Sequence, residues 1–172
     1  MNPFCGCPAD LKNESKAFIY EHNVLFNKDK TTLISYRAKE ANYVIPDSVT
    51  SIGACAFLEC NSLTSIIIPD SVTSIGVWAF AQCNSLTSIN IPDSVTTIGN
   101  HAFLYCKSLT SINISNGVMS IGDNAFEGCV SLNSIKISDS VTSIGDYAFG
   151  ECDSLSPQVK SDIIQRFGEN VF

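Results

Sequence analysis

The sequence lacks the features of several large functional classes. No apolar run reaches the roughly 18 residues that a membrane-spanning helix needs. The first residues hold no basic segment followed by an apolar stretch, so we expect no secretory signal among them. No Gly-x-Ser-x-Gly, His-Glu-x-x-His, P-loop or Gly-x-Gly-x-x-Gly motif occurs, and the histidines His22 and His101 are far apart in sequence. We therefore expect no membrane insertion, no enzymatic activity and no cofactor.

Basic side chains are also few: there are 10 Lys and Arg against 17 Asp and Glu, which gives a net charge of −7. The deficit lies between residues 45 and 155, where Lys107 and Lys136 stand against ten acidic residues. Residues 1–44 carry six basic and five acidic side chains, and residues 156–172 are neutral overall. Nucleic acids and anionic membranes attract basic proteins, so we expect neither as a partner.

What the sequence does have is a 23-residue repeat that runs from Ile45 to about Leu155. Five copies follow the pattern I-P-D-S-V-T-S-I-G-x-x-A-F-x-x-C-x-S-L-T-S-I-x. A unit this short cannot bury its apolar side chains alone, so it must stack on its neighbours. The repeat predicts a mainly β, right-handed solenoid of five regular repeats at 45–155. An irregular region at 1–44 precedes them, and a helical cap at 156–172 follows.

Each copy contains two segments with strand character. The first has the form Leu63-x-x-Ile66-x-Ile68, whose alternating end places β-branched residues on one face. The second has the form Val49-x-x-Ile52-Gly, and we predict a second short strand there, on the opposite flank. The Pro-Asp-Ser between them predicts a turn, because Pro fixes φ and Asp and Ser bond to nearby backbone.

The Ala-Phe-x-x-Cys part of each copy predicts a column of buried side chains. The three-residue spacing of Phe and Cys fits a 3₁₀-like turn that faces inward. The columns are Phe57, Phe80, Phe103, Phe126 and Phe149, and Cys60, Cys83, Cys106, Cys129 and Cys152. Stacked side chains point in parallel, which holds their Cβ atoms too far apart for a disulfide, so we expect buried thiols. Cys5 and Cys7 lack a second ligand pair at zinc spacing, so no metal site is expected.

The combination I-P-x-x-V-x-x-I-G-x-x-A-F-x-x-C-x-x-L-x-x-I resembles the BspA-type leucine-rich repeat, over about two-thirds of the chain. That repeat occurs in surface proteins of Bacteroides-like bacteria and spirochaetes and in some parasitic protists. The resemblance implies a leucine-rich-repeat-like solenoid with little helix. It also implies a cell-surface or secreted protein that binds host or cell-surface proteins, with adhesion as its role. It supplies no catalytic residues.

The positions that differ between copies predict the binding surface, because the structure fixes most other columns. One group lies beside the Ala-Phe turn, where aromatic side chains are typical of binding hot spots. The other group lies on the outward side of the longer strand. The candidates beside the turn are Trp78, His101, Tyr105 and Tyr147, and those on the strand are Ile67, Asn90, Asn113 and Lys136. The alternative is that the turn residues only cover the turns.

Both ends depart from the repeat. Phe4 and Cys7 keep the Phe–Cys spacing, which suggests that the chain starts inside a copy and self-associates at an open N-terminal end. Residues 24–36 predict a hairpin with a polar turn. Ser156-Pro157 predicts the start of an amphipathic helix over about 157–167, which would close the last strand.

Three alternatives remain open at this level. The chain could be a structural spacer or a self-assembling segment of a larger protein. The aligned Ser and Thr columns would suit an ice-binding array, and the Asp column a calcium ladder. Hydrogen bonds between rungs and turn formation explain these two columns without a ligand.

Overall fold

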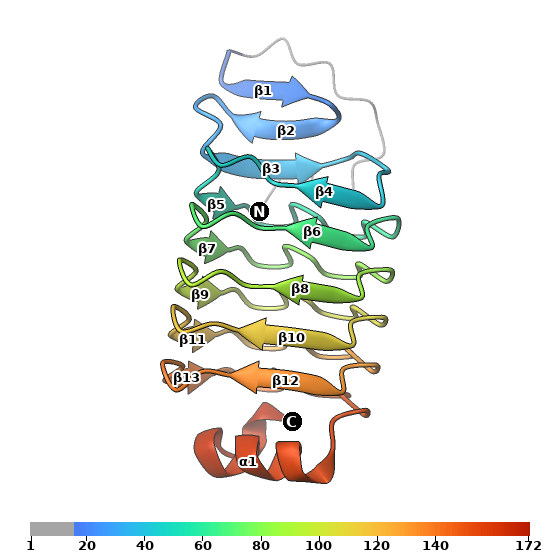
Figure 1. Cartoon of the computed structure of the whole chain (residues 1–172), viewed down its shortest axis with the longest axis vertical. Coiled ribbons are helices and arrows are strands. Elements are labelled where there is room, and N and C mark those ends of the chain that lie inside the picture. Colours follow the sequence, from blue (N-terminus) through green and yellow to red (C-terminus); the bar gives the residue numbers. More distant parts are fainter. Residues whose placement is uncertain (1–15) are drawn as a thin grey trace.

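The computed structural model describes residues 16–172 and shows an elongated coil of stacked rungs (Figure 1). Each regular rung holds a longer strand and a two-residue strand, joined by a corner that is Pro-Asp-Ser in the first three rungs and begins with Ser115 or Ser138 in the last two. The longer strands are β4 (Asn42–Val44), β6 (Ser65–Ile67), β8 (Ser88–Asn90), β10 (Ser111–Ile114) and β12 (Ser134–Ile137). The short ones are β5 (Ser51–Ile52), β7 (Ser74–Ile75), β9 (Thr97–Ile98), β11 (Ser120–Ile121) and β13 (Ser143–Ile144). The predicted β solenoid is confirmed.

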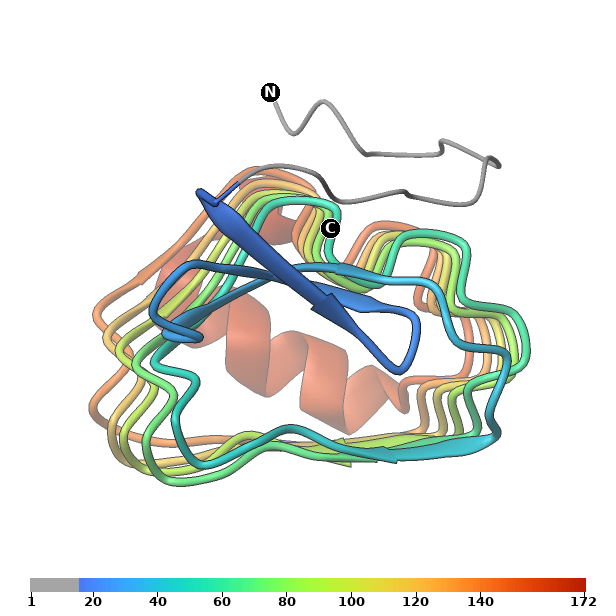
Figure 2. The same ribbon diagram turned by 90° about the horizontal axis from the view of Figure 1, so that it is seen from above.

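The longer strands pair in parallel and in register with the next rung, except between β6 and β8, where their sheet is interrupted. Ile112 of β10, for example, lies opposite Ile89 of β8 and Ile135 of β12. The short strands pair in the same way, from β5 through β13. Each side chain therefore lies above its equivalent in the next rung, and the rungs superpose in the view along the coil (Figure 2).

The repeated phenylalanines run through the centre of the coil. All five are fully buried. Consecutive rings from Phe57 to Phe149 are stacked with centroids 4.8–5.4 Å apart and interplanar angles of at most 10°. The valines and leucines of the repeat are buried around them. A single ring therefore contacts the rings above and below it as well as its own rung.

The Ala-Phe-x-x-Cys segment makes the i→i+3 bonds of a 3₁₀-like turn only at alternate residues. The N–H groups of Ala56, Leu58 and Cys60 donate to the carbonyl three residues earlier. The intervening N–H groups of Phe57 and Glu59 donate to carbonyls of the next rung. Residues with positive φ recur in this segment, and they allow this alternation. The turns thus form a third hydrogen-bonded ladder along the coil.

The N-terminal end is closed by three antiparallel strands. The predicted hairpin is present as β2 (Val24–Asn27) and β3 (Thr32–Tyr36), and β3 pairs in parallel with β5. The sequence did not predict β1 (Phe18–Glu21), which pairs with β2 and crosses the end of the coil (Figure 2). The expected half-repeat around Phe4 and Cys7 lies outside the described residues, so self-association at this end stays a prediction.

The C-terminal end is closed by α1 (Pro157–Phe167) and the 3₁₀ helix η1 (Glu169–Val171). The predicted helix is confirmed. Ser156 is its N-cap and accepts a hydrogen bond from the Val159 N–H at 3.3 Å. The turn ladder explains η1. The last turn has no following rung to accept its hydrogen bonds, and the N–H groups of Tyr147 and Phe149 donate instead to carbonyls of η1. Within residues 16–172, no helix has the length and apolarity needed to cross a membrane.

The stacked rings lead to a stability prediction. Replacing the central ring in Phe103→Ala removes contacts with two other rings, and we expect the free energy of unfolding to fall by about 3–5 kcal/mol. Urea denaturation measures the change. Tyr147→Ala is the control, because this side chain is 59% exposed and its loss should change stability little. Equal free energies of unfolding for the two variants would contradict the claim that the stacked rings stabilise the fold.

Candidate functional site

The structure places the candidate residues on two separate surfaces. The outward side of β4, β6, β8, β10 and β12, here called the sheet face, forms one long wall of the coil (Figure 1). It carries Ile67, Asn90, Asn113 and Lys136, all exposed. The Ala-Phe turns follow the short strands and form the turn ridge, which includes Trp78, His101, Tyr105 and Tyr147. The two groups of predicted residues therefore do not form one site.

An apolar pair stands at the N-terminal end of the sheet face. Val44 of β4 and Ile67 of β6 are register partners and are 62% and 61% exposed. In the following rungs the same row holds Asn90, Asn113 and Lys136. The neighbouring Ile66 is buried, because strand side chains alternate between the core and the solvent. The row thus changes along the coil from apolar through amide to basic.

A surface groove runs from this pair round the corner of the coil. Its walls include Val44 and Ile67, and at the corner Asp47 and Asp70. Both aspartates are exposed. Apolar side chains beside two carboxylates suit a ligand that places an aliphatic group next to a basic one.

The sequence reasoning did not find Val44, because this residue precedes the first regular copy. Its signal is the spacing: Val44 stands 23 residues before Ile67, as Ile67 stands 23 before Asn90. Extending the repeat backwards by one rung would have placed it in the row.

Three of the four candidate residues of the turn ridge are packed against other parts of the chain. The rings of Trp78 and His101 are stacked, with centroids 4.4 Å apart and an interplanar angle of 3°, and both side chains are half-buried. The Tyr105 ring occupies the space beside Gly128, where an added Cβ would clash with it. Tyr147 alone of the four is exposed. This packing favours the interpretation that three of these residues cover the turns.

These side chains also adopt an unusual backbone conformation. Trp78, His101, Tyr105 and Tyr147 have φ between 53° and 60°. Bulky residues are rare in this region, which glycine and asparagine enter more easily. Asn124 and Gly128 stand at equivalent positions. The same turn thus forms with aromatic residues in some copies and with Asn or Gly in another.

The column cysteines form a ladder of thiol hydrogen bonds. Each thiol donates to the carbonyl of the phenylalanine one rung earlier, at sulfur–oxygen distances of 3.0–3.2 Å. The donors are Cys83, Cys106, Cys129 and Cys152, and none of the cysteines that the structure describes forms a disulfide.

The thiols of the cysteine column are poorly suited to nucleophilic catalysis or to metal binding. Burial raises the pKa of the Cys152 thiol to about 12 and also raises the pKa of Cys129 and Cys60. Contact with the Cys106 thiol, together with burial, raises the pKa of Cys83. A buried thiol that keeps its proton is a poor nucleophile and a poor metal ligand. No three His, Cys, Asp or Glu side chains of residues 16–172 converge as metal ligands.

Comparison with known families gives one match. The profile described as "BspA type Leucine rich repeat region (6 copies)" matches residues 35–156. A comparison with curated proteins finds no significant match.

Several solved bacterial structures are similar to this chain. A leucine-rich cell surface protein of Faecalibacterium prausnitzii is 29% identical, with a TM-score of 0.59, over 74% of this chain and 41% of its own. A leucine-rich repeat protein of Eubacterium ventriosum is 25% identical, with a TM-score of 0.59, over 82% and 51%. The pneumococcal vaccine antigen PcpA is 22% identical, with a TM-score of 0.76, over 91% and 46%. The chain thus spans about half the length of these relatives or less.

The buried thiols predict a loss of stability in alkali. A free thiol titrates near pH 8.5, and the raised pKa values mean that the folded chain keeps these protons to higher pH than the unfolded chain. Their contribution is complete below about pH 8.5 and falls as pH rises toward about 12, by up to about 1.4 kcal/mol per pH unit for each thiol. Urea denaturation between pH 7.5 and 10, under reducing conditions, measures this slope.

The control variant is Cys152→Ala, which removes one shifted thiol and should give a shallower slope. A free energy of unfolding that stays constant across this pH range would contradict the burial of protonated thiols.

Proposed function

Because this chain belongs to the BspA-type leucine-rich repeat family, we propose that it is a non-enzymatic protein-binding module of a bacterial cell-surface or secreted protein. It binds a host extracellular-matrix or cell-surface protein through the sheet face, and it acts in adhesion. The similarity to a bacterial leucine-rich cell surface protein supports the location. The binding role and the partner are inferred from the surface.

The observation that carries the proposal is the exposed pair Val44 and Ile67. These two side chains are the most exposed large apolar residues of the described chain and lie side by side. Neighbouring exposed apolar side chains are typical of surfaces that a partner covers. The parallel pairing of β4 with β6 already orders the backbone of this part of the face, so binding would order little additional chain.

The charge of the molecule indicates the chemistry of the partner. Asp47 and Asp70 line the groove beside the apolar pair. Acidic residues outnumber basic ones by eight between residues 45 and 155. Complementary charge steers association and selects among partners. The partner therefore presents an aliphatic side chain next to a basic one.

The test uses substitutions that the fold already accommodates in other rungs. In the double variant Val44→Asn and Ile67→Asn, both positions receive the residue found at Asn90 and Asn113 of the same row. We expect this variant to bind an immobilised panel of fibronectin, laminin and collagen at least 10-fold more weakly than the parent chain, by surface plasmon resonance. Thermal unfolding verifies that both proteins are folded.

The matched control is Met119→Thr. Met119 is 53% exposed, and the equivalent positions in other rungs, such as Thr96 and Thr142, hold threonine. This variant also removes an exposed apolar side chain but should bind as the parent does. Undiminished binding by the double variant would contradict the choice of surface. Absence of binding, together with concentration-dependent fibres in light scattering, would favour the spacer instead.

A further inference from the structure

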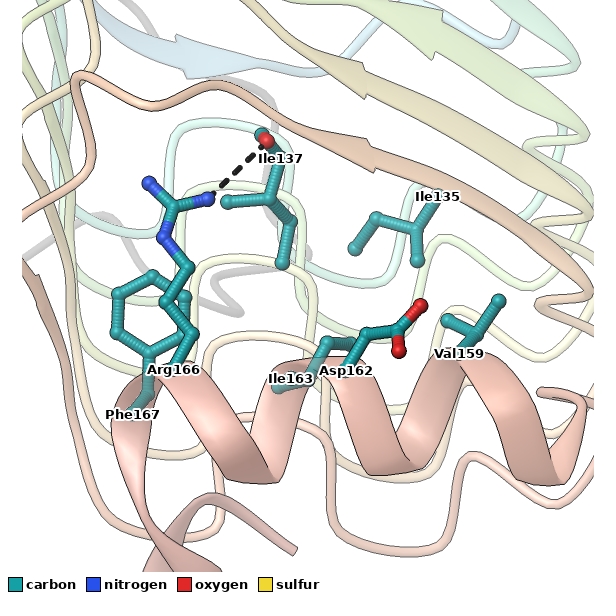
Figure 3. A pocket seen from close by; sticks show the side chains of 7 residues that line it. All are labelled: Ile135, Ile137, Val159, Asp162, Ile163, Arg166 and Phe167. Atoms are coloured by element: carbon teal, nitrogen blue, oxygen red, sulfur yellow. Dashed lines mark hydrogen bonds between the residues drawn. The ribbon is translucent and has the colours of Figure 1, made fainter.

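The C-terminal end of the coil contains a cleft between β12 and α1 (Figure 3). We propose that this cleft binds an extended peptide segment of a partner protein, which adds to β12 as a further parallel strand. This site is separate from the sheet-face groove and does not depend on the function proposed for that groove.

The backbone of β12 has an open edge toward the cleft. Ser134 N–H donates to the Thr110 carbonyl, and the register with β10 directs the backbone groups of Ser134 and Lys136 toward that strand. In a parallel ladder the alternate residues, Ile135 and Ile137, direct their N–H and C=O groups to the other edge. Of these four groups, only the Ile137 carbonyl has a partner among the described residues.

That partner is a side chain of α1. Arg166 Nη1 donates to the Ile137 carbonyl at 3.4 Å, a weak contact, while Nη2 donates to Ser138 and Val141 carbonyls at 2.7 and 3.1 Å. Arg166 thus satisfies the backbone just beyond β12. The N–H groups of Ile135 and Ile137 and the Ile135 carbonyl remain available to a ligand.

The side chains of this last rung are also incompletely covered. Ile112 and Ile114 in the rung before are 3% and 1% exposed, whereas Ile135 and Ile137 are only half-buried. In Figure 3 both isoleucines point from β12 toward α1. The helix covers this end of the coil but leaves space in front of these two residues.

The opposite wall of the cleft is partly apolar. Val159, Ile163 and Phe167 from α1 form its apolar part, and Asp162 and Arg166 of the same helix border it. The cavity measures about 190 Å³. An apolar cavity of ~150 Å³ takes up benzene, so this one has room for an aliphatic side chain of a ligand.

These features select a single extended chain as the occupant. Only another backbone offers donors and acceptors at the spacing of an open strand edge, and strand addition is an established way to bind peptides. A second copy that met this one with its C-terminal end would bring its own α1 to the same edge, so it would not reach β12. Asp162 and Arg166 both border the cleft. Arg166 is engaged with backbone carbonyls and with Asp139, so the exposed carboxylate of Asp162 favours a basic residue in the segment.

The probe for this proposal comes from the chain itself. Strand β10 pairs with β12 in the folded protein, so a fluorescein-labelled peptide of residues 107–116 carries the side chains and spacing of a rung neighbour. We expect saturable binding to the full chain in fluorescence anisotropy. In parallel addition, the N–H groups of Ser111 and Asn113 of the peptide face β12, and those of Ile112 and Ile114 face away.

N-methylation therefore provides matched peptides. Methyl groups on the nitrogens of Ser111 and Asn113 should weaken binding at least 10-fold, whereas methyl groups on the nitrogens of Ile112 and Ile114 should leave it unchanged. Equal binding by the two methylated peptides, or no saturable binding by the unmodified one, would overturn strand addition.

Protein variants locate the site. Val159→Phe fills the cleft and should abolish binding, whereas Ser161→Phe adds the same ring at an exposed position of α1 and should not. Unchanged binding by Val159→Phe, with the fold verified by thermal unfolding, would overturn the placement. A dimer that Val159→Phe dissociates would assign the cleft to a second copy and also overturn the proposal. Val44→Asn with Ile67→Asn should keep peptide binding, which separates this site from the sheet face.

Discussion

The hydrogen bonds between equivalent residues of successive rungs are the constraint on which the rest of the structure depends. They run along three ladders: the longer strands, the short strands and the turns. The first of these ladders is interrupted between β6 and β8, where the other two continue. Because every rung is bonded in register, a repeated residue in the sequence becomes a column in space. The stacked rings from Phe57 to Phe149 and the thiol ladder both follow from this register. Threonine hydroxyls reinforce it, as where Thr110 Oγ1 bonds to the Thr87 carbonyl.

The regular rungs provide rigidity, and the distinctive surface chemistry lies near the two ends of the coil. Val44 belongs to the irregular region that precedes the first complete copy, and with Ile67 it forms an apolar pair that later rungs replace with polar residues. At the other end, β12 has no following strand, and α1 covers its edge incompletely. Both proposed binding surfaces therefore arise where the self-complementary array is interrupted and groups that a neighbouring rung would cover remain exposed.

Much of the fold could be predicted from the sequence, because a repeat of fixed length leaves few arrangements that bury its apolar residues. The two strands of each rung, the hairpin at 24–36 and the helix from Pro157 were predictable from local patterns. The η1 helix was not predictable, because its carbonyls accept hydrogen bonds from N–H groups of the last turn, and this pairing is evident only in three dimensions. The same limit applies to the candidate site. Variation between copies indicated Trp78 and His101, but only the structure shows that their rings stack on each other.

Native-state hydrogen exchange tests the central claim most directly, since it reports whether the turns form a ladder between rungs. In the central rungs, the amides of Phe80 and Phe103 donate to the next rung, although they lie outside any strand. The account predicts that these two amides exchange only through global unfolding, as slowly as amides of the paired strand β10. Exchange of the Phe80 and Phe103 amides at the rate of exposed loops, with β10 still protected, would contradict it.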